Sequence, residues 1–186
     1  MLQEHRHLEG RRIATQGPGV LRVARIEDCA RFSLRVADGN IALASKAFGC
    51  DLPRIIGATS ASGARLALCL GPDEWQLLAP LDGRDAIEAK FAALYPKMPH
   101  SLVDVSHREV GIVVEGTGAT LALRSACPLD LRDTAVATVT RTVFDKAQII
   151  LFREGENRFR IEVWQSFADH VWGILQAAGR EIELGI

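Results

Sequence analysis

A carboxylate, a hydroxyl and an imidazole stand close together in VDVSHREVGI, residues 103–112. Asp104, Ser106 and His107 are the residue types of a catalytic triad, in which a base activates a hydroxyl nucleophile. Side chains alternate along an extended strand, so Asp104 and Ser106 face one way and His107 faces the other. Triads also need their members within hydrogen-bond reach and usually draw them from distant segments. We therefore interpret Asp104, Ser106 and His107 as a structural motif that ties a strand end to its neighbour.

Known catalytic motifs do not occur elsewhere in the sequence. The chain lacks G-x-G-x-x-G, a P-loop, H-E-x-x-H and G-x-S-x-G, which build dinucleotide, phosphate, zinc and nucleophile sites. GTG at 116–118 predicts only a turn between a strand and a helix. His5 and His7 have few other ligand types nearby, so we expect a solvated tail rather than a metal site. The sequence thus assigns no catalytic, cofactor-binding or metal-binding residue to this chain.

The composition is that of a soluble globular protein. Apolar residues make up 48% and charged residues 24% of the 186 positions, and the formal net charge is -1. This charge is too small to indicate a nucleic acid or a membrane surface as partner. The four cysteines form no C-x-x-C pair, and the first residues lack the apolar run of a signal peptide. We predict a cytoplasmic protein.

Two hairpins, each followed by a helix, organise the chain. ARLALCLGPDEWQLLAP at 64–80 reads as two strands around a turn, and a helix follows from Asp82 until Pro96. AQIILFREGENRFRIEVW at 147–164 repeats this pattern, and the helix after it ends at Gly179. The two units match at a constant offset of 84 residues, as in the apolar helix positions Ile87 with Val171 and Phe91 with Leu175.

The match continues upstream at an offset of 78 residues. FSLRVADGNIALASKAFGC, beginning at 32, aligns with VGIVVEGTGATLALRSACP, beginning at 110. Each half then reads strand, helix, hairpin, helix. We predict an α+β fold whose two pseudo-symmetric halves, about 21–100 and 101–186, form a single domain. Residues 1–20 match neither half and contain GPG, so we predict a flexible N-terminal arm there.

Two aromatic residues are candidates for an interface. On the strand 158–164, Phe159, Ile161 and Val163 share the inward face, which leaves Trp164 on the opposite face, with Phe167 soon after it. Exposed aromatic side chains often anchor protein–protein contacts. We therefore interpret Trp164 and Phe167 as interface candidates.

Several linked motifs carry a family resemblance over about residues 60–178. They are LGPDEWQLLAP, DVSHREVGI, ACPLDL, TRTVFDKAQIIL and FRIEVWQSFADHVWGIL. Together they resemble the gamma subunit family of heterotetrameric sarcosine oxidases, small members of the folate-binding superfamily of the glycine cleavage T-protein. The resemblance implies a T-protein-like, folate-binding-type domain.

The same resemblance implies partners and a reaction. In such a heterotetramer the alpha, beta, gamma and delta subunits together oxidatively demethylate sarcosine to glycine, with tetrahydrofolate accepting the one-carbon unit. FAD, FMN and NAD are expected on alpha and beta and zinc on delta, whereas gamma packs against the folate-handling region of alpha. The gamma chain itself is expected to be structural, without cofactor or catalytic residue.

One departure bears on the choice between functions. T-protein relatives carry paired aspartates where this sequence has FDKAQII, and here Ala147 and Gln148 occupy those positions. Neither can accept a proton or stabilise a cation, so independent one-carbon transfer is not expected. The alternatives are a freestanding folate-binding enzyme or regulator of the T-protein superfamily, and a scaffold domain of another complex.

Overall fold

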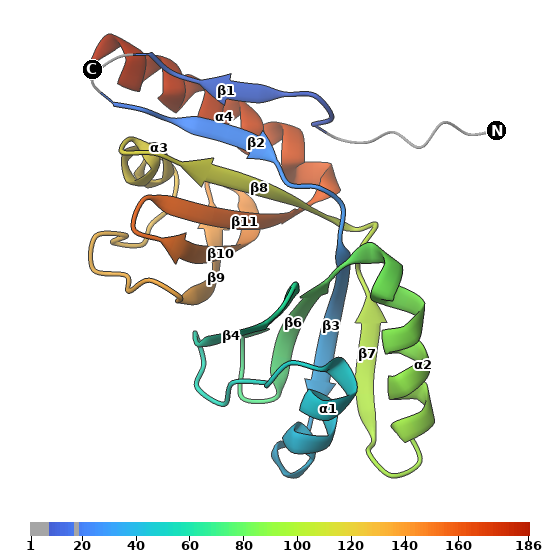
Figure 1. Ribbon diagram of the computed structural model, residues 1–186. Helices are drawn as coiled ribbons and strands as arrows, with labels where there is room; N and C mark the ends of the chain where they lie inside the picture. The colour runs from blue at the N-terminus through green and yellow to red at the C-terminus, as the bar shows by residue number, and fades with distance from the viewer. Residues whose placement is uncertain (1–7, 17–18) are drawn as a thin grey trace, which may run out of the picture. The chain divides into compact units, whose positions relative to one another are not determined.

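The computed structural model describes residues 8–16 and 19–186, drawn as a ribbon in Figure 1. His5, His7 and the rest of residues 1–7, with 17–18, lie outside the described residues. The chain divides into two compact units, one made of 1–27 with 108–186 and the other of 28–107. No helix in the described ranges is long and apolar enough to cross a membrane.

The unit of residues 28–107 is a five-stranded antiparallel sheet in the order β4-β5-β6-β3-β7, with both its helices packed on one face. The strands are β3 (Ala30–Val36), β4 (Thr59–Ser62), β5 (Arg65–Cys69), β6 (Glu74–Ala79) and β7 (His100–Asp104). The helices are α1 (Ile41–Phe48) and α2 (Arg84–Leu94). Trp75, Ile87 and Phe91 are buried between sheet and helices, as the apolar pattern predicts. Helix α2 begins at Arg84, two residues after the predicted start at Asp82. Asp82 lies in a 3-10 turn, and Gly83 is the N-cap residue of α2.

The other unit is a six-stranded antiparallel sheet in the order β1-β2-β8-β11-β10-β9. Its elements are β1 (Arg12–Ala14), β2 (Arg22–Arg25), β8 (Glu109–Glu115), α3 (Ala119–Arg124), β9 (Val139–Phe144), β10 (Ala147–Gly155), β11 (Arg158–Trp164) and α4 (Gln165–Leu184). Phe159, Ile161 and Val163 point together into a core that α3 and α4 close. The predicted α+β class, with its two hairpin–helix units, is therefore confirmed.

Helix α4 extends beyond the predicted end at Gly179. Gly179 lies inside the helix, and a Cβ atom placed there would sit 3.2 Å from Cγ2 of Ile13 and 3.5 Å from Cδ2 of Leu21. The missing side chain therefore makes room for β1 and its neighbour rather than ending the helix. The helix ends instead at Gly185, whose φ of 72° is the left-handed conformation that glycine adopts easily.

Each unit contains one strand, β2 or β7, that directly precedes a strand of the other unit in the sequence. Strand β2 runs directly into β3 but pairs with β8, whereas β7 runs directly into β8 but pairs with β3. This exchange moves the unit bounds to 27/28 and 107/108, away from the predicted halves 21–100 and 101–186. Part of the predicted N-terminal arm also belongs to a sheet, because Arg12–Ala14 pair with β2.

Candidate functional site

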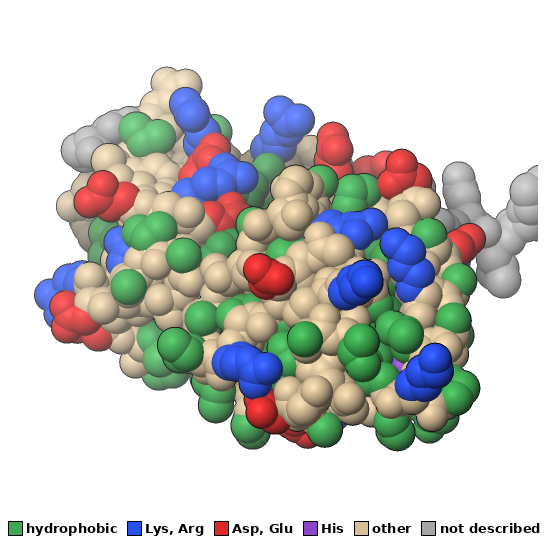
Figure 2. Space-filling view, turned by 60° about the horizontal axis from the view of Figure 1, so that its bottom comes forward, with side chains coloured by type: hydrophobic (Ala, Val, Ile, Leu, Met, Phe, Trp, Pro, Cys, Tyr) green, Lys and Arg blue, Asp and Glu red, His purple; other side chains and the backbone are tan. Residues whose placement is uncertain are grey.

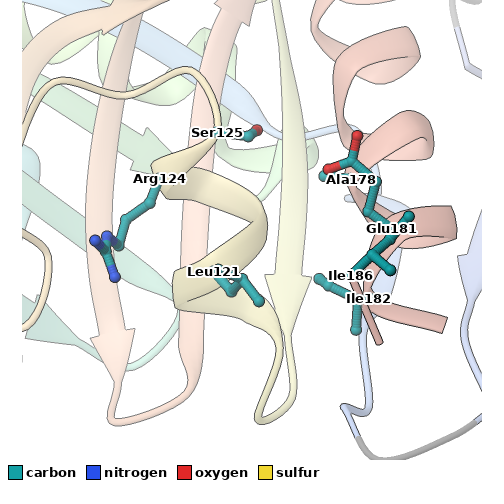
Figure 3. A pocket seen from close by; sticks show the side chains of 7 residues that line it. All are labelled: Leu121, Arg124, Ser125, Ala178, Glu181, Ile182 and Ile186. Atoms are coloured by element: carbon teal, nitrogen blue, oxygen red, sulfur yellow. The ribbon is translucent and has the colours of Figure 1, made fainter. Parts of the chain in front are cut away.

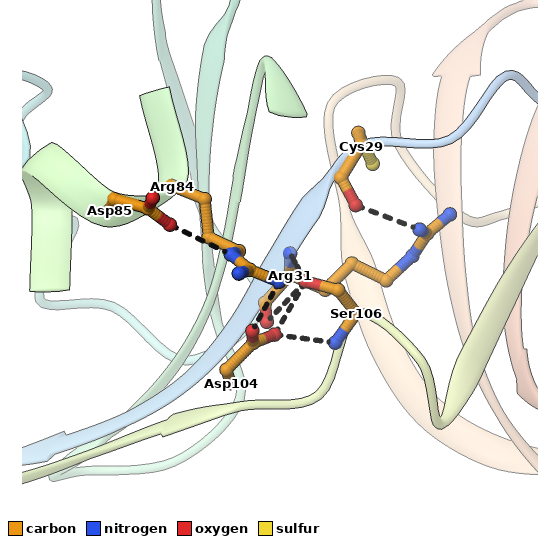
Figure 4. Close-up of polar contacts among 6 residues, drawn as sticks. All are labelled: Cys29, Arg31, Arg84, Asp85, Asp104 and Ser106. Atoms are coloured by element: carbon orange, nitrogen blue, oxygen red, sulfur yellow. Dashed lines mark hydrogen bonds and ion pairs between the residues drawn. The ribbon is translucent and has the colours of Figure 1, made fainter. Parts of the chain in front are cut away.

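Asp104 and Ser106 form the centre of a polar network at the end of β7 (Figure 4). The hydroxyl of Ser106 donates to Oδ1 of Asp104 at 2.5 Å, and the backbone N–H of Ser106 donates to the same oxygen at 2.8 Å. The second bond closes an Asx turn, in which an aspartate caps the backbone two residues ahead. The backbone N–H of Arg31, on β3, donates to the Ser106 hydroxyl oxygen at 2.9 Å. The network thus joins the ends of two neighbouring strands.

Arg84, at the first turn of α2, extends this network. Its Nη1 lies 3.5 Å from Oδ2 of Asp104, and its Nε donates to Oδ1 of Asp85 at 3.2 Å. The hydrogen bond to Asp85, with the charges of Asp85 and Asp104, raises the pKa of the guanidinium of Arg84. Asp104 and Ser106 therefore connect β7, β3 and α2 within one unit.

His107 differs from Asp104 and Ser106 in its exposure. It lies in the turn after β7 and is exposed, whereas the other two side chains are partly buried. The hydroxyl of Ser106 donates directly to a carboxylate and accepts a backbone N–H, so no imidazole stands between base and hydroxyl. A serine nucleophile needs that intermediate base. The arrangement can hold backbone segments in place, but its geometry differs from that of a triad.

Trp164 lies at the end of β11 with its ring partly open to solvent. It keeps 43% of its surface exposed, and the guanidinium of Arg108 lies 5.2 Å from the ring centroid. Arg108 also donates to Oε1 of Glu109 at 3.1 Å. Phe167, in the first turn of α4, exposes 38% of its surface. Both predicted interface candidates are therefore accessible, and one of them carries a stacked cation.

The sheet register extends the surface around Trp164 across three strands. Val163 pairs with Ile149, which places Gln148 beside Trp164, and Gln148 in turn pairs with Val143. All three side chains of this row, Val143, Gln148 and Trp164, are exposed. On the face that Figure 2 draws, hydrophobic side chains are scattered among charged and other side chains rather than gathered in one large apolar patch.

Ala147 and Gln148, where the resemblance to T-protein relatives implies paired aspartates, lie at the start of β10. Ala147 is fully buried in the core, and Gln148 is exposed on the opposite face. The nearby Asp145 instead lies in the β9–β10 turn with a φ of 52°, and its Oδ2 is 2.8 Å from Nε2 of His170 on α4. Sequence reasoning missed this pair, because 25 residues separate its members and no motif links them.

Two hollows lie apart from these residues. One cavity of about 290 Å³ lies between α3 and the end of α4 (Figure 3). A wider hollow of about 630 Å³ lies beside α1 and β4. The first is lined by Leu121, Arg124, Ser125, Ala178, Glu181, Ile182 and Ile186. Neither hollow contains a residue that the sequence singled out.

The thiols and possible metal ligands show no further reactive cluster in the described part of the chain. Burial raises the pKa of the thiols of Cys69 and Cys127, which disfavours the nucleophilic thiolate. Within residues 8–16 and 19–186, no group of three or more histidine, cysteine, aspartate or glutamate side chains is placed to hold a metal ion.

Comparisons with known proteins agree with one another. The model of the sarcosine oxidase, gamma subunit family matches residues 35–181. The sarcosine oxidase subunit gamma of Corynebacterium sp. strain P-1 is 32% identical over 135 residues, and that of strain U-96 is 35% identical over 136 residues. Each match covers 71% of this chain but only 66% and 64% of the respective relative, so the chain spans just under two thirds of their length.

Solved structures show the same fold. A chain of the heterotetrameric sarcosine oxidase from Corynebacterium sp. U-96, in complex with pyrrole 2-carboxylate, superposes with a TM-score of 0.84 at 27% identity, covering 91% of this chain and 89% of that chain. Aminomethyltransferase T of the glycine cleavage system from Bartonella henselae superposes with a TM-score of 0.64 at 14% identity, covering 82% and 44%. The second likeness concerns the fold alone. The matched family model covers most of the chain, and the chain belongs to the sarcosine oxidase gamma subunit family.

Proposed function

We propose that this chain is the gamma subunit of a heterotetrameric sarcosine oxidase and acts there as a structural, non-catalytic subunit. Its partners are the alpha, beta and delta subunits, and the complex works in sarcosine catabolism in the cytoplasm. The complex oxidatively demethylates sarcosine to glycine and passes the one-carbon unit to tetrahydrofolate. Family membership and the TM-score of 0.84 to a chain of a heterotetrameric sarcosine oxidase support this proposal.

The cofactors of the complex belong, in this proposal, to the partner subunits. FAD, FMN, NAD, zinc and tetrahydrofolate are held by alpha, beta and delta, and none by this chain. The side chain of Ala147 is the observation that carries the non-catalytic role, because a methyl group packed in the core occupies a position where T-protein relatives supply an acid. A buried methyl group can neither accept a proton nor stabilise a developing positive charge.

The contact with partner subunits is proposed at the surface of Trp164 and Phe167. Large, partly exposed aromatic side chains supply much of the binding energy at interfaces. The guanidinium of Arg108 lies 5.2 Å from the centroid of the indole ring of Trp164, and a cation over an aromatic face is attracted to it.

Co-purification and activity together test this function. The chain is expressed with a tag, alone and with the alpha, beta and delta subunits, and flavin absorbance and sarcosine-dependent peroxide formation are recorded on each eluate. We expect the single chain to be colourless and inactive, and the co-expressed chain to retain flavin-containing partners. Sarcosine oxidation by the single chain contradicts the non-catalytic role. Failure to retain any partner contradicts the subunit role.

A second measurement distinguishes the proposed structural subunit from the alternative of a freestanding folate-binding protein. Tetrahydrofolate is titrated into the single chain while tryptophan fluorescence is followed, with free tryptophan as control for inner-filter quenching. The subunit proposal predicts no saturable quenching. Saturable quenching, together with no retained partner, favours a folate-binding enzyme or regulator instead.

A further inference from the structure

Strand β7 leaves one side of its backbone open at the edge of its sheet. The N–H of Val105 donates to the carbonyl of Arg31 at 2.8 Å, which sets the odd-numbered residues of β7 as those that bond to β3. The peptide groups of the alternate residues therefore point away from β3: His100, Leu102 and Asp104. In the described ranges, no other strand pairs with that side. An open edge of this kind is a template for another strand.

In the other unit, the strand equivalent to β7 carries an additional strand at its edge. Val23 of β2 pairs with Val114, and His100 of β7 pairs with Val36, which corresponds to Val114 at the repeat offset of 78 residues. Strands β2 and β7 are thus equivalent. The edge of β2 carries β1 as an added antiparallel strand, with Ile13 paired to Val23. One unit therefore carries an added strand at this position, and the sheet of residues 28–107 has none there.

The helix beside β7 carries a different residue at this position from its counterpart in the other unit. In the unit of residues 1–27 and 108–186, Gly179 of α4 makes room for Ile13 of β1. The repeat offset of 84 residues places Tyr95 at the position of Gly179, immediately after α2 ends. Tyr95 exposes 58% of its surface, and its ring centroid lies 5.5 Å from that of His100. An exposed aromatic side chain thus borders the edge, where an added strand can pack against it.

The residues of β7 complement a second copy of themselves. Antiparallel pairing centred on Leu102 places the two Leu102 side chains opposite each other, and places His100 of each copy opposite Asp104 of the other. Leu102 is only half-buried in the single chain, so the pairing removes apolar surface from water. Directly opposite apolar side chains stabilise neighbouring strands, and so do complementary polar pairs such as an imidazole and a carboxylate.

We propose that β7 pairs with β7 of a second copy of this chain. The two five-stranded sheets then form one continuous antiparallel sheet across a two-fold axis, and each copy presents the same surface to the other. The inference concerns the chain by itself and does not rest on the proposed function.

The first test is the mass of the full chain in solution. Size-exclusion chromatography with light scattering over a dilution series is expected to show a dimer that dissociates on dilution. Leu102→Pro removes an outward N–H without breaking the ladder to β3, and we expect it to make the chain monomeric at every concentration. Leu102→Ala is the matched control, because it also loses the leucine side chain but keeps the N–H, and we expect it to retain a weakened dimer.

A crosslink tests the register independently of the proline variant. In the proposed pairing Ser101 lies opposite Val103 of the other copy in a non-hydrogen-bonded pair, where Cα atoms are about 4.5 Å apart and a disulfide can form. Ser101→Cys/Val103→Cys is expected to give a disulfide-linked dimer under mild oxidation. Val103→Cys alone is expected to crosslink far less. This single variant controls for disulfides that involve the native cysteines.

Three results would overturn the proposal. The first is a monomer at all concentrations. The second is a dimer that survives Leu102→Pro and gives no crosslink in the double variant, because another surface then holds it. The third is a monomeric chain whose β7 amides gain protection from hydrogen exchange only with the alpha, beta or delta subunits, which assigns the edge to a partner strand.

Discussion

The hydroxyl of Ser106 lies 2.5 Å from Oδ1 of Asp104, and this one carboxylate oxygen also accepts the backbone N–H of Ser106. Through the N–H of Arg31, the pair connects segments that are 75 residues apart in the sequence. The contact lies just before the chain passes from β7, in the unit of residues 28–107, to β8 in the other unit. We propose that Asp104 and Ser106 serve the stability of the fold rather than catalysis.

Replacing Asp104 by alanine is therefore expected to lower the free energy of unfolding by about 1 to 3 kcal/mol, because partly buried donors lose their acceptor. Chemical denaturation of the full chain measures this change. Asp85→Ala is the matched control, since it removes a more exposed carboxylate from the same arginine and is expected to have little effect. A complex that contains Asp104→Ala and still assembles is expected to keep its turnover per flavin. A loss of turnover with normal assembly and stability would show that the motif takes part in chemistry.

Trp164→Ala is expected to weaken assembly more than folding. The side chain lies at a strand end outside the hydrophobic core, so its loss leaves the core residues of the single chain in place. At an interface, loss of a central aromatic residue costs about 2 kcal/mol or more of binding free energy. Affinity for the partner subunits is measured by titration beside the melting temperature, with Leu121→Ala as an exposed apolar control on α3. Unchanged affinity at unchanged melting temperature would place the interface elsewhere.

Arg153 anchors the long connection between α3 and β9. Its guanidinium donates to the carbonyl oxygens of Leu131 at 3.0 Å, Glu156 at 2.9 Å and Thr134. Arg153→Met keeps most of the apolar stem but loses these charged hydrogen bonds, so we expect a loss of about 2 kcal/mol and faster proteolytic cleavage within residues 127–138.

Arg158→Met is the control for Arg153→Met. Arg158 lies on the same hairpin but pairs with the carboxylates of Glu154 and Glu115 while half-exposed, and surface ion pairs contribute about 0 to 1 kcal/mol. Equal cleavage rates in the two variants would mean that Arg153 does not hold the connection.

Asp130 is expected to titrate well below the ordinary pKa of an aspartate carboxyl group. Hydrogen bonds from the side chain and backbone N–H of Arg132 lower the pKa of its carboxyl group from 3.8 to about 2. The folded chain then binds fewer protons than the unfolded chain between these two values. The contribution to stability is therefore present above pH 3.8 and is lost as the pH falls towards 2. Carbon NMR titration of the carboxyl group measures this pKa, and Arg132→Gln is expected to return it towards 3.8. An unshifted pKa in the unaltered chain would contradict the expectation.

Local patterns in the sequence were sufficient to predict the hairpin strands, the helices that follow them and the internal repeat. Alternation in RFRIEVW and the spacing of Val171 and Leu175 predict a strand and a helix, because a buried strand face has a period of two and a buried helix stripe a period near 3.6. The same alternation places Trp164 opposite Phe159, Ile161 and Val163, and the structure shows it partly exposed. The residue motifs also sufficed to indicate the family.

Only the tertiary structure decided which strands pair and which polar groups meet. The exchange of β2 and β7 between sheets cannot be read from their sequences, because an antiparallel ladder bonds through backbone groups that all residues except proline share. Ser106 meets Arg31, and Asp145 meets His170, only after distant segments pack together. Gly179 likewise signals a helix end in the sequence, whereas the approach of Ile13 makes it a contact point within α4. Sequence periodicity records which face of an element is buried, but the burying partner is fixed by long-range packing.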